Sequence, residues 1–252
     1  MQQDTIIKSV DTNQQRILKN ILKLYNIPEV TVDFTYSTGN FYKPSNVDGE
    51  ILQIEEPKYK FDVYPQTEDT VKIDKLSPIP LEDNSCKCVV YDPPFVISPN
   101  KAPSVINPKD GSNIIQKRFA SFYPVDELLE TYYFHMKEIY RMLEDDGYAI
   151  IKCQNTVTGG KQLNSVEYLW FIGESLGLDM VDKFVLTAKA RVLGNMKKQQ
   201  HSRRYESYFL VFTKSMKKKS KYLTFDNKEL MQSIVDGFFK NNFIEKTKYI
   251  AK

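Results

Sequence analysis

The chain has 252 residues, of which 41% are hydrophobic and 27% are charged, the balance of an ordinary globular protein. No apolar run reaches the 18 residues of a membrane span, and the first residues lack the basic and apolar regions of a signal peptide. We therefore expect a cytoplasmic protein that does not bind a membrane. The three cysteines have no CxxC spacing, so we expect free thiols in strands and no metal site.

The net charge of +3 is unevenly distributed along the chain. Residues 214–252 contain ten lysines and four acidic residues, a net charge of +6, which leaves −3 on the remainder. A basic tail of this kind indicates either a polyanionic partner or a solvated linker. We predict one catalytic domain over 1–213, followed by a basic linker and a short helical appendage over 214–252.

Apolar residues at helical spacing predict a first helix over 12–25, with Thr12 as its N-cap. Short β-branched and aromatic runs then predict strands. These strands are 30–34, 59–63, 70–73 and 86–91. Residues 96–123 show no periodicity, and a loop of this length inside a domain is usually functional or disordered.

The second half begins with a long amphipathic helix over 125–144, in which we expect His135 to be structural or partly exposed. The elements predicted after it are a strand over 147–153, a helix over 163–176, and strands over 180–186 and 205–213. The alternation predicts an α/β fold with a mostly parallel seven-stranded sheet and helices on both faces. Because no helix joins the last two strands, we expect an antiparallel strand at one edge.

An aspartate stands at or near the end of each of the first four strands. These residues are Asp33, Asp62, Asp74 and Asp92. A single aspartate after a strand is commonly a turn or helix cap. Ligands bind beyond the carboxyl ends of the strands of an open α/β sheet, so four such acids at one edge indicate a ligand site.

The order of these motifs resembles the amino-methyltransferase branch of the Rossmann-like class I S-adenosylmethionine enzymes. Residues 33–39 lie over that family's first motif, with Ser37 in place of its first glycine and Gly39 retained. Asp62 matches the acid that the family places on the cofactor ribose, and a carboxylate accepts from two vicinal hydroxyls at once. Asp74 resembles the motif bordering the cofactor adenine. The resemblance implies S-adenosyl-L-methionine as cofactor, bound by Asp33, Thr35, Tyr36, Ser37, Gly39, Asp62, Asp74, Lys75 and Asp92.

The tetrapeptide Asp92-Pro93-Pro94-Phe95 resembles the family's catalytic motif. An exocyclic amine is a poor nucleophile because its lone pair is delocalised into the ring. The Asp92 carboxylate and the Pro93 carbonyl can each accept one N–H bond from it, and the two prolines make the turn rigid. Phe95 offers a face on which a flipped base can stack. The alternative interpretation is an ordinary Pro-Pro turn after a strand.

Within this branch, the chain is similar to small phage and bacterial DNA adenine methylases, which implies transfer to N6 of adenine in duplex DNA. The pair Arg118-Phe119, the triplet Lys152-Cys153-Gln154 and the run 208–212 carry that similarity. Basic segments flank the expected site and could hold phosphates. The residues that we expect at the nucleic acid are Lys117, Arg118, Gln154, Arg191, Lys197, Lys198, His201, Arg203 and Arg204.

One further residue has an expected role, and two alternative functions remain compatible with the sequence. Asn155, which follows Gln154, is expected to cap a helix or turn. An RNA base methyltransferase would use the same tetrapeptide chemistry. A catalytically silent module that binds nucleic acid or a partner protein would keep the fold, and the altered glycine motif at Ser37 favours that alternative.

Overall fold

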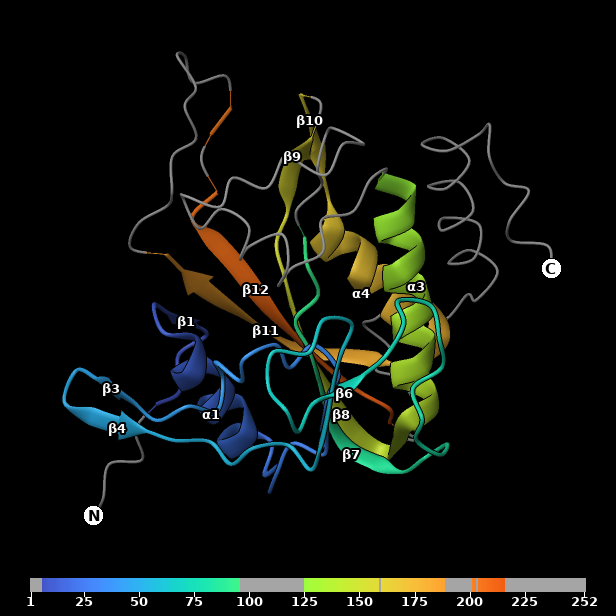
Figure 1. Cartoon of the computed structure of the whole chain (residues 1–252). Helices are drawn as coiled ribbons and strands as arrows, with labels where there is room; N and C mark the ends of the chain where they lie inside the picture. Colours follow the sequence, from blue (N-terminus) through green and yellow to red (C-terminus); the bar gives the residue numbers. More distant parts are fainter. Residues whose placement is uncertain (1–5, 96–124, 159, 189–200, 203, 216–252) are drawn as a thin grey trace, which may run out of the picture.

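The computed structural model describes residues 6–95, 125–158, 160–188, 201–202 and 204–215. Its main feature is an eight-stranded sheet in the order β1-β11-β12-β8-β7-β2-β5-β6 (Figure 1). The strands of this sheet are β1 (Val10–Asp11), β2 (Val32–Asp33), β5 (Tyr59–Asp62), β6 (Val71–Lys72), β7 (Cys86–Tyr91), β8 (Leu143–Cys153), β11 (Asp179–Thr187) and β12 (Glu206–Thr213). The helices are α1 (Gln14–Leu24), α3 (Val125–Met142) and α4 (Ser165–Leu176).

The sheet is mixed, and β12 is the strand that runs against its neighbours. It pairs antiparallel with both β8 and β11, whereas β1–β11, β8–β7, β7–β2, β2–β5 and β5–β6 are parallel pairs. The prediction of a seven-stranded sheet with an antiparallel strand at one edge is therefore wrong in two respects. β12 lies inside the sheet, and β1 adds an eighth strand at the edge through two paired residues, too few to show a periodicity.

Helices cover both faces of the sheet, as the alternation predicted. Cys88 and Val90 of β7 pack in the cluster that contains α1, while Val89 and Tyr91 pack in the cluster that contains α3 and α4. This alternation follows from the two-residue period of a strand. The free thiols of the strands, including Cys153, are buried in these clusters as expected.

Two small hairpins were not predicted, and one helix cap was misplaced. β3 (Ser45–Val47) pairs with β4 (Glu50–Leu52), and β9 (Thr156–Thr158) pairs with β10 (Lys161–Leu163). Each is too short to carry a period-two pattern. The N-cap of α1 is Asn13, whose side chain accepts from the Arg16 N–H at 2.9 Å. Thr12, the predicted cap, lies one residue too early.

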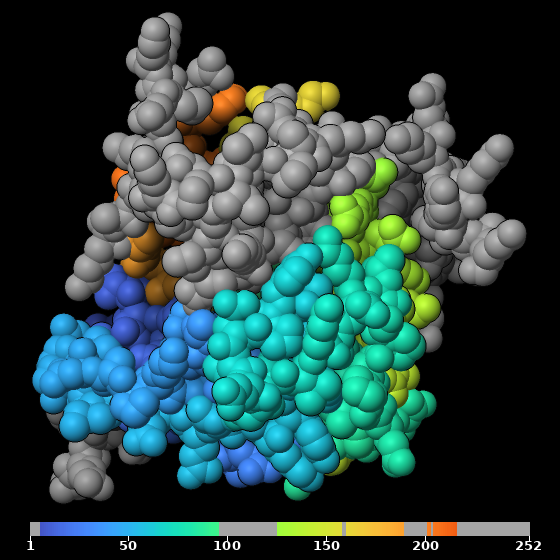
Figure 2. All heavy atoms as spheres, viewed as in Figure 1, coloured from blue at the N-terminus to red at the C-terminus, as the bar shows by residue number. Residues whose placement is uncertain are grey.

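The chain order of the parallel strands creates a topological switch point between β2 and β7. From β2 the chain moves outward to β5 and β6, and it then returns to the other side of β2 as β7 and β8. Loops that leave the carboxyl ends of two such strands turn in opposite directions and open a crevice. The segments between β3 and β7 lie side by side on one face of the molecule, light blue to green in Figure 2. Among the described residues, no helix is long and apolar enough to cross a membrane.

Candidate active site

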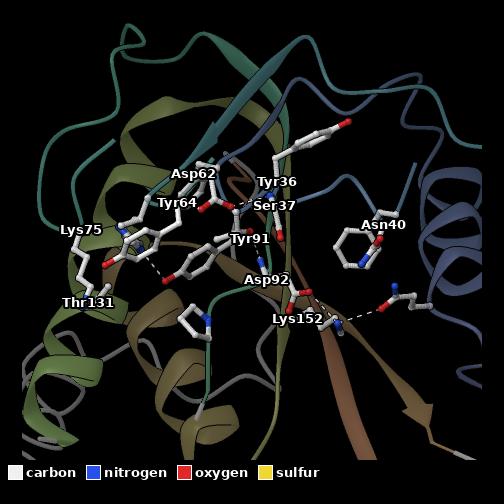
Figure 3. Close-up of a pocket in the computed structure, with 17 residues that line it drawn as sticks. Tyr36, Ser37, Asn40, Asp62, Tyr64, Lys75, Tyr91, Asp92, Thr131 and Lys152 are labelled. Carbon is white, nitrogen blue, oxygen red and sulfur yellow. Dashed lines mark hydrogen bonds and ion pairs between the residues drawn. The ribbon is translucent and has the colours of Figure 1, made fainter. Parts of the chain in front are cut away.

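A cavity opens at the switch point, between the segments that follow β2, β5 and β7 (Figure 3). Seven of the predicted site residues line it. They are Thr35, Tyr36, Ser37, Asp62, Lys75, Asp92 and Pro94. The structure therefore brings together residues that are up to 59 positions apart, between Thr35 and Pro94.

Asp62 and the loop after β2 form one wall of this cavity. The two carboxylate oxygens of Asp62 accept backbone N–H bonds from Ser37 and Tyr64, both at 2.7 Å. Burial raises the pKa of Asp62, while these two bonds lower it. Each oxygen has a second lone pair, so the carboxylate can still accept hydroxyl groups from the cavity.

Two residues of the loop after β2 adopt left-handed backbone conformations, and one of them, Ser37, is not a glycine. Ser37 adopts a left-handed conformation with φ of 52°, and Gly39 has φ of 69°. A Cβ atom on Gly39 would lie 2.4 Å from the hydroxyl of Tyr36. Tyr36 is buried and stacks on Tyr42, so it has no room to retreat. The loop thus requires a glycine at 39 and tolerates strain at 37.

Only two of the four strand-end aspartates, Asp62 and Asp92, line the cavity. Asp33 is 1% exposed, and its carboxylate accepts from the Tyr42 hydroxyl at 2.9 Å and from the Thr35 backbone N–H at 2.9 Å. Burial raises the pKa of Asp33 to about 7. Asp74 is exposed and, like Asp33, is not among the residues that line the cavity. Both are placed beside the cavity, while Asp62 and Asp92 border it directly.

The Asp92 turn forms the opposite wall and is fixed at three points. The Asp92 backbone N–H donates to the Thr35 hydroxyl at 2.7 Å. Lys152 donates from Nζ to Asp92 Oδ2 at 2.9 Å, and the Tyr132 hydroxyl donates to the Pro94 carbonyl at 3.2 Å. The first of these bonds joins the turn after β7 directly to the loop after β2.

A second cavity lies on the other side of Lys152. It is lined by Phe95 together with Thr12, Asn13, Gln14, Leu186, Thr187, Ala188 and Ser207. Lys152 and Gln14 line both cavities. Phe95 therefore faces a different hollow from Asp62, and the Asp92–Lys152 pair stands at the boundary between them.

His135 also lines the first cavity, which the sequence did not indicate beyond a structural role. It is 4% exposed, and its Nδ1 shares a hydrogen bond of 2.7 Å with the Tyr91 hydroxyl. Burial lowers the pKa of His135 to about 4, so the ring is neutral at neutral pH. The surrounding rings of Phe34 and Tyr91 meet it edge-on.

Most of the residues predicted at the nucleic acid lie outside the described residues. These are Lys117, Arg118, Arg191, Lys197, Lys198 and Arg203. Gln154 is buried and donates to the Glu206 carbonyl, which ties β8 to β12. Arg204 donates to Gln162 at 2.8 Å, beside the β9–β10 hairpin, and His201 is exposed. The N-cap position of α4 is Asn164, whose side chain makes no capping bond. Asn155, just after the end of β8, takes over that task, because its Oδ1 accepts from the Val166 N–H in the first turn of α4 at 2.9 Å.

Several lining residues were not predicted, including Gln14, Tyr64, Thr131 and Lys152. Gln14 and Thr131 belong to helices whose pattern only indicates which face is buried. Two signals for Lys152 were available in the sequence: its position near the end of the predicted strand 147–153, and its place in the Lys152-Cys153-Gln154 landmark. No cluster of three or more potential metal ligands occurs among the described residues.

Comparison with known proteins gives distant structural neighbours. The sequence matches no protein-family model and no curated protein. A proposed DNA modification methylase from Thermus thermophilus, crystallised with S-adenosyl-L-methionine, aligns with 14% identity over 57% of this chain and 51% of its own, with a TM-score of 0.35. This chain thus spans about half the length of that protein.

Two further neighbours cover more of the chain. A methyltransferase dependent on S-adenosylmethionine from Thermotoga maritima has 15% identity over 79% of this chain and 97% of its own, with a TM-score of 0.37. The cyclase SpnF has 10% identity over 81% of both chains, with a TM-score of 0.43. Similarities at this level assign no activity to the present chain, which has to be inferred from its own residues.

Proposed function

We propose that the chain is an S-adenosylmethionine-dependent methyltransferase that methylates N6 of adenine in duplex DNA, with the target base flipped out of the helix. The observation that carries the proposal is the position of Asp92. It leaves the carboxyl end of β7 at the switch point, and its backbone is hydrogen-bonded to the loop after β2. That position supports amine chemistry beside a bound cofactor.

The residues of the first cavity fit the proposed cofactor. Asp62 offers carboxylate oxygens suited to two vicinal hydroxyls. The Ser37 Oγ is buried without a hydrogen-bond partner among the described residues, which suits a polar ligand at the same wall. Gly39 leaves the loop without a side chain where one would clash. When bound, the cofactor would supply an electrophilic methyl group on a sulfonium sulfur.

The chain's own residues would then orient and activate the acceptor amine. The Asp92 carboxylate accepts one N–H of the amine and the Pro93 carbonyl accepts the other, which draws the nitrogen towards a tetrahedral shape. The nitrogen lone pair forms the new N–C bond as the S–C bond breaks, and the pair of electrons of the broken bond stays on the sulfur of the leaving thioether. The N–H proton bound by the Asp92 carboxylate then passes through that carboxylate to solvent. Holding both partners in line supplies much of the rate. Phe95, in the second cavity, offers a stacking face for the base.

A DNA substrate is supported by sequence and by chemistry. Residues 189–204 contain six basic side chains and no acidic one, which suits a phosphate backbone. An aspartate at the head of the tetrapeptide is more typical of adenine than of cytosine methylases. The same tetrapeptide also serves RNA bases, so RNA is a direct comparison in the test.

The test is methyl transfer to unmethylated genomic DNA and, separately, to total RNA. The protein is incubated with labelled S-adenosylmethionine, the polymer is digested to nucleosides, and the labelled base is identified. We expect N6-methyladenine from DNA. Asp92→Ala should reduce transfer by at least about 100-fold, the effect of removing a positioned proton acceptor, while calorimetry shows that the variant still binds the cofactor.

A matched control is Asp83→Ala, at the other end of β7, where an exposed aspartate pairs with Arg141. This variant should keep wild-type activity. Label in RNA alone would contradict the DNA substrate. Cofactor binding without transfer to either polymer would favour the catalytically silent module.

A further inference from the structure

We propose that Lys152 is a positioning residue for the reaction, which holds the Asp92 carboxylate in the rotamer that presents its other oxygen to the acceptor amine. The inference rests on the proposed function and adds a residue to it. It starts from the ion pair between Lys152 Nζ and Asp92 Oδ2 at 2.9 Å, which joins β8 to the turn after β7 (Figure 3).

The sheet register places these two side chains on the same face. Tyr91 of β7 is the partner of Ile151 of β8, so the next residues along the two parallel strands, Asp92 and Lys152, stand side by side. Side chains alternate along a strand, and Val90 and Ile150, two residues earlier, both point into the cluster around α1. The pair therefore results from the strand register and does not depend on a flexible loop.

Lys152 is itself held from three directions. Its ammonium donates to Asp92 and to Gln14 Oε1 at 3.2 Å, and it lies 5.3 Å from the centre of the Phe41 ring. The side chain is only 13% exposed. An ammonium with a fixed carboxylate, a fixed amide and an aromatic ring is more restricted than an exposed surface lysine, whose ion pairs contribute little.

The chemistry explains why one oxygen of Asp92 should be occupied. A carboxylate whose χ2 is free presents its two oxygens in many directions. Lys152 fixes Oδ2, and within the described part of the chain no donor binds Oδ1. The fixed rotamer leaves Oδ1 as the acceptor for an amine N–H. Because Lys152 lines both cavities, it lies where the cavity proposed for the cofactor meets the cavity proposed for the target base.

The experiment compares Lys152→Met and Lys152→Arg with wild type at saturating cofactor and DNA. Lys152→Met should lower kcat about 10- to 100-fold, the range of a misplaced catalytic group. The KM for S-adenosylmethionine and the cofactor Kd should stay within about threefold. Lys152→Arg keeps a cation with a fork of donors and should recover most of kcat.

A matched control and a double-mutant cycle separate positioning from folding. Lys214→Met removes another partly buried ammonium, which binds Asn84 and two carbonyls at the far end of the sheet. It should lower the melting temperature and leave kcat unchanged. In an Asp92→Asn background, Lys152→Met should cost less than about threefold in kcat, because interacting residues are not additive.

Two results would overturn the inference while the proposed function stands. One is a Lys152→Met enzyme with wild-type kcat, and the other is an equal loss from Lys152→Met with and without Asp92. A wild-type protein that binds the cofactor and transfers no methyl group would instead overturn the proposed function, and the role of Lys152 with it.

Discussion

The loop after β2 and the turn after β7 face each other across the first cavity, and they are held by different interactions. The β2 loop depends on backbone features, namely left-handed residues at Ser37 and Gly39 and N–H bonds to Asp62. The β7 turn depends on side chains, with Thr35, Lys152 and Tyr132 each binding one of its groups. A wall shaped by the backbone suits shape recognition of a cofactor, while a wall that carries the Asp92–Lys152 ion pair suits proton and amine chemistry.

The variant with the largest expected effect on the first wall alone is Asp62→Ala, which tests whether the two walls have different roles. Asp62→Ala leaves the Ser37 and Tyr64 N–H groups without their acceptor and removes the carboxylate from the cavity. We expect the Kd for S-adenosylmethionine to rise about 10- to 150-fold, since a charged hydrogen-bond partner contributes about 1.5–3 kcal/mol. Calorimetry measures the affinity, and kcat at saturating cofactor should fall much less than in Asp92→Ala.

The control for this variant is Asp69→Ala, which removes an exposed carboxylate from the ion pair with Lys60 on the same side of the sheet. Its cofactor affinity should stay within about twofold, as for other exposed pairs. A loss of kcat without a loss of affinity in Asp62→Ala would break the proposed division between the two walls.

The second prediction tests whether the β2 loop depends on backbone shape. Gly39→Ala places a methyl group against the buried Tyr36 ring in a left-handed conformation. It should destabilise the protein by about 1–3 kcal/mol and weaken cofactor binding. Urea unfolding and calorimetry measure the two effects.

Ser37→Gly is the opposite change in the same loop. Glycine relieves the strain of φ at 52° and removes a buried hydroxyl, at the cost of a more flexible unfolded chain. The net effect should be a stabilisation of up to about 1 kcal/mol. If Gly39→Ala proved neutral, the loop would not need its present backbone shape.

The third prediction concerns two buried titratable groups beside the cavity whose pH dependences have opposite sign. The pKa of Asp33 is raised to about 7, so the unfolded chain loses this proton first and the stability falls as pH rises from about 4 to 7. The pKa of His135 is lowered to about 4, so the unfolded chain binds this proton first. The contribution of His135 is present above about pH 6.5 and is lost as pH falls towards 4.

Replacing one group should expose the dependence of the other. In Asp33→Asn the effect of His135 remains, so the free energy of unfolding should rise more steeply with pH between about 4.5 and 7 than in wild type. In His135→Asn the effect of Asp33 remains, so the free energy of unfolding should fall as pH rises over the same range. The change between these pH values should be about 1–3 kcal/mol. Urea unfolding at three pH values measures it, and parallel curves for all three proteins would contradict the burial of both groups.

The sequence predicted best the strands whose two faces are both buried under helices. The predicted strand 86–91 matches β7 residue for residue, because a nearly continuous apolar run between turn residues has few alternatives. The positions of Asp62 and Asp92 at the cavity follow from the same pattern, since both end parallel strands. By contrast, β1 and the hairpins β3–β4 and β9–β10 involve two or three residues per strand, which is too few for an alternating pattern to be recognised.

The sequence by itself thus determined the α/β alternation, the strand that delivers Asp92, and the residue types suited to amine activation. The tertiary structure alone decided that β12 enters the sheet between β8 and β11 and that Asp33 is enclosed by Tyr42. It also decided that Lys152 pairs with Asp92. Periodicity reports which face of an element is buried, whereas pairings between residues 60 positions apart depend on strand order and register, which local sequence does not encode.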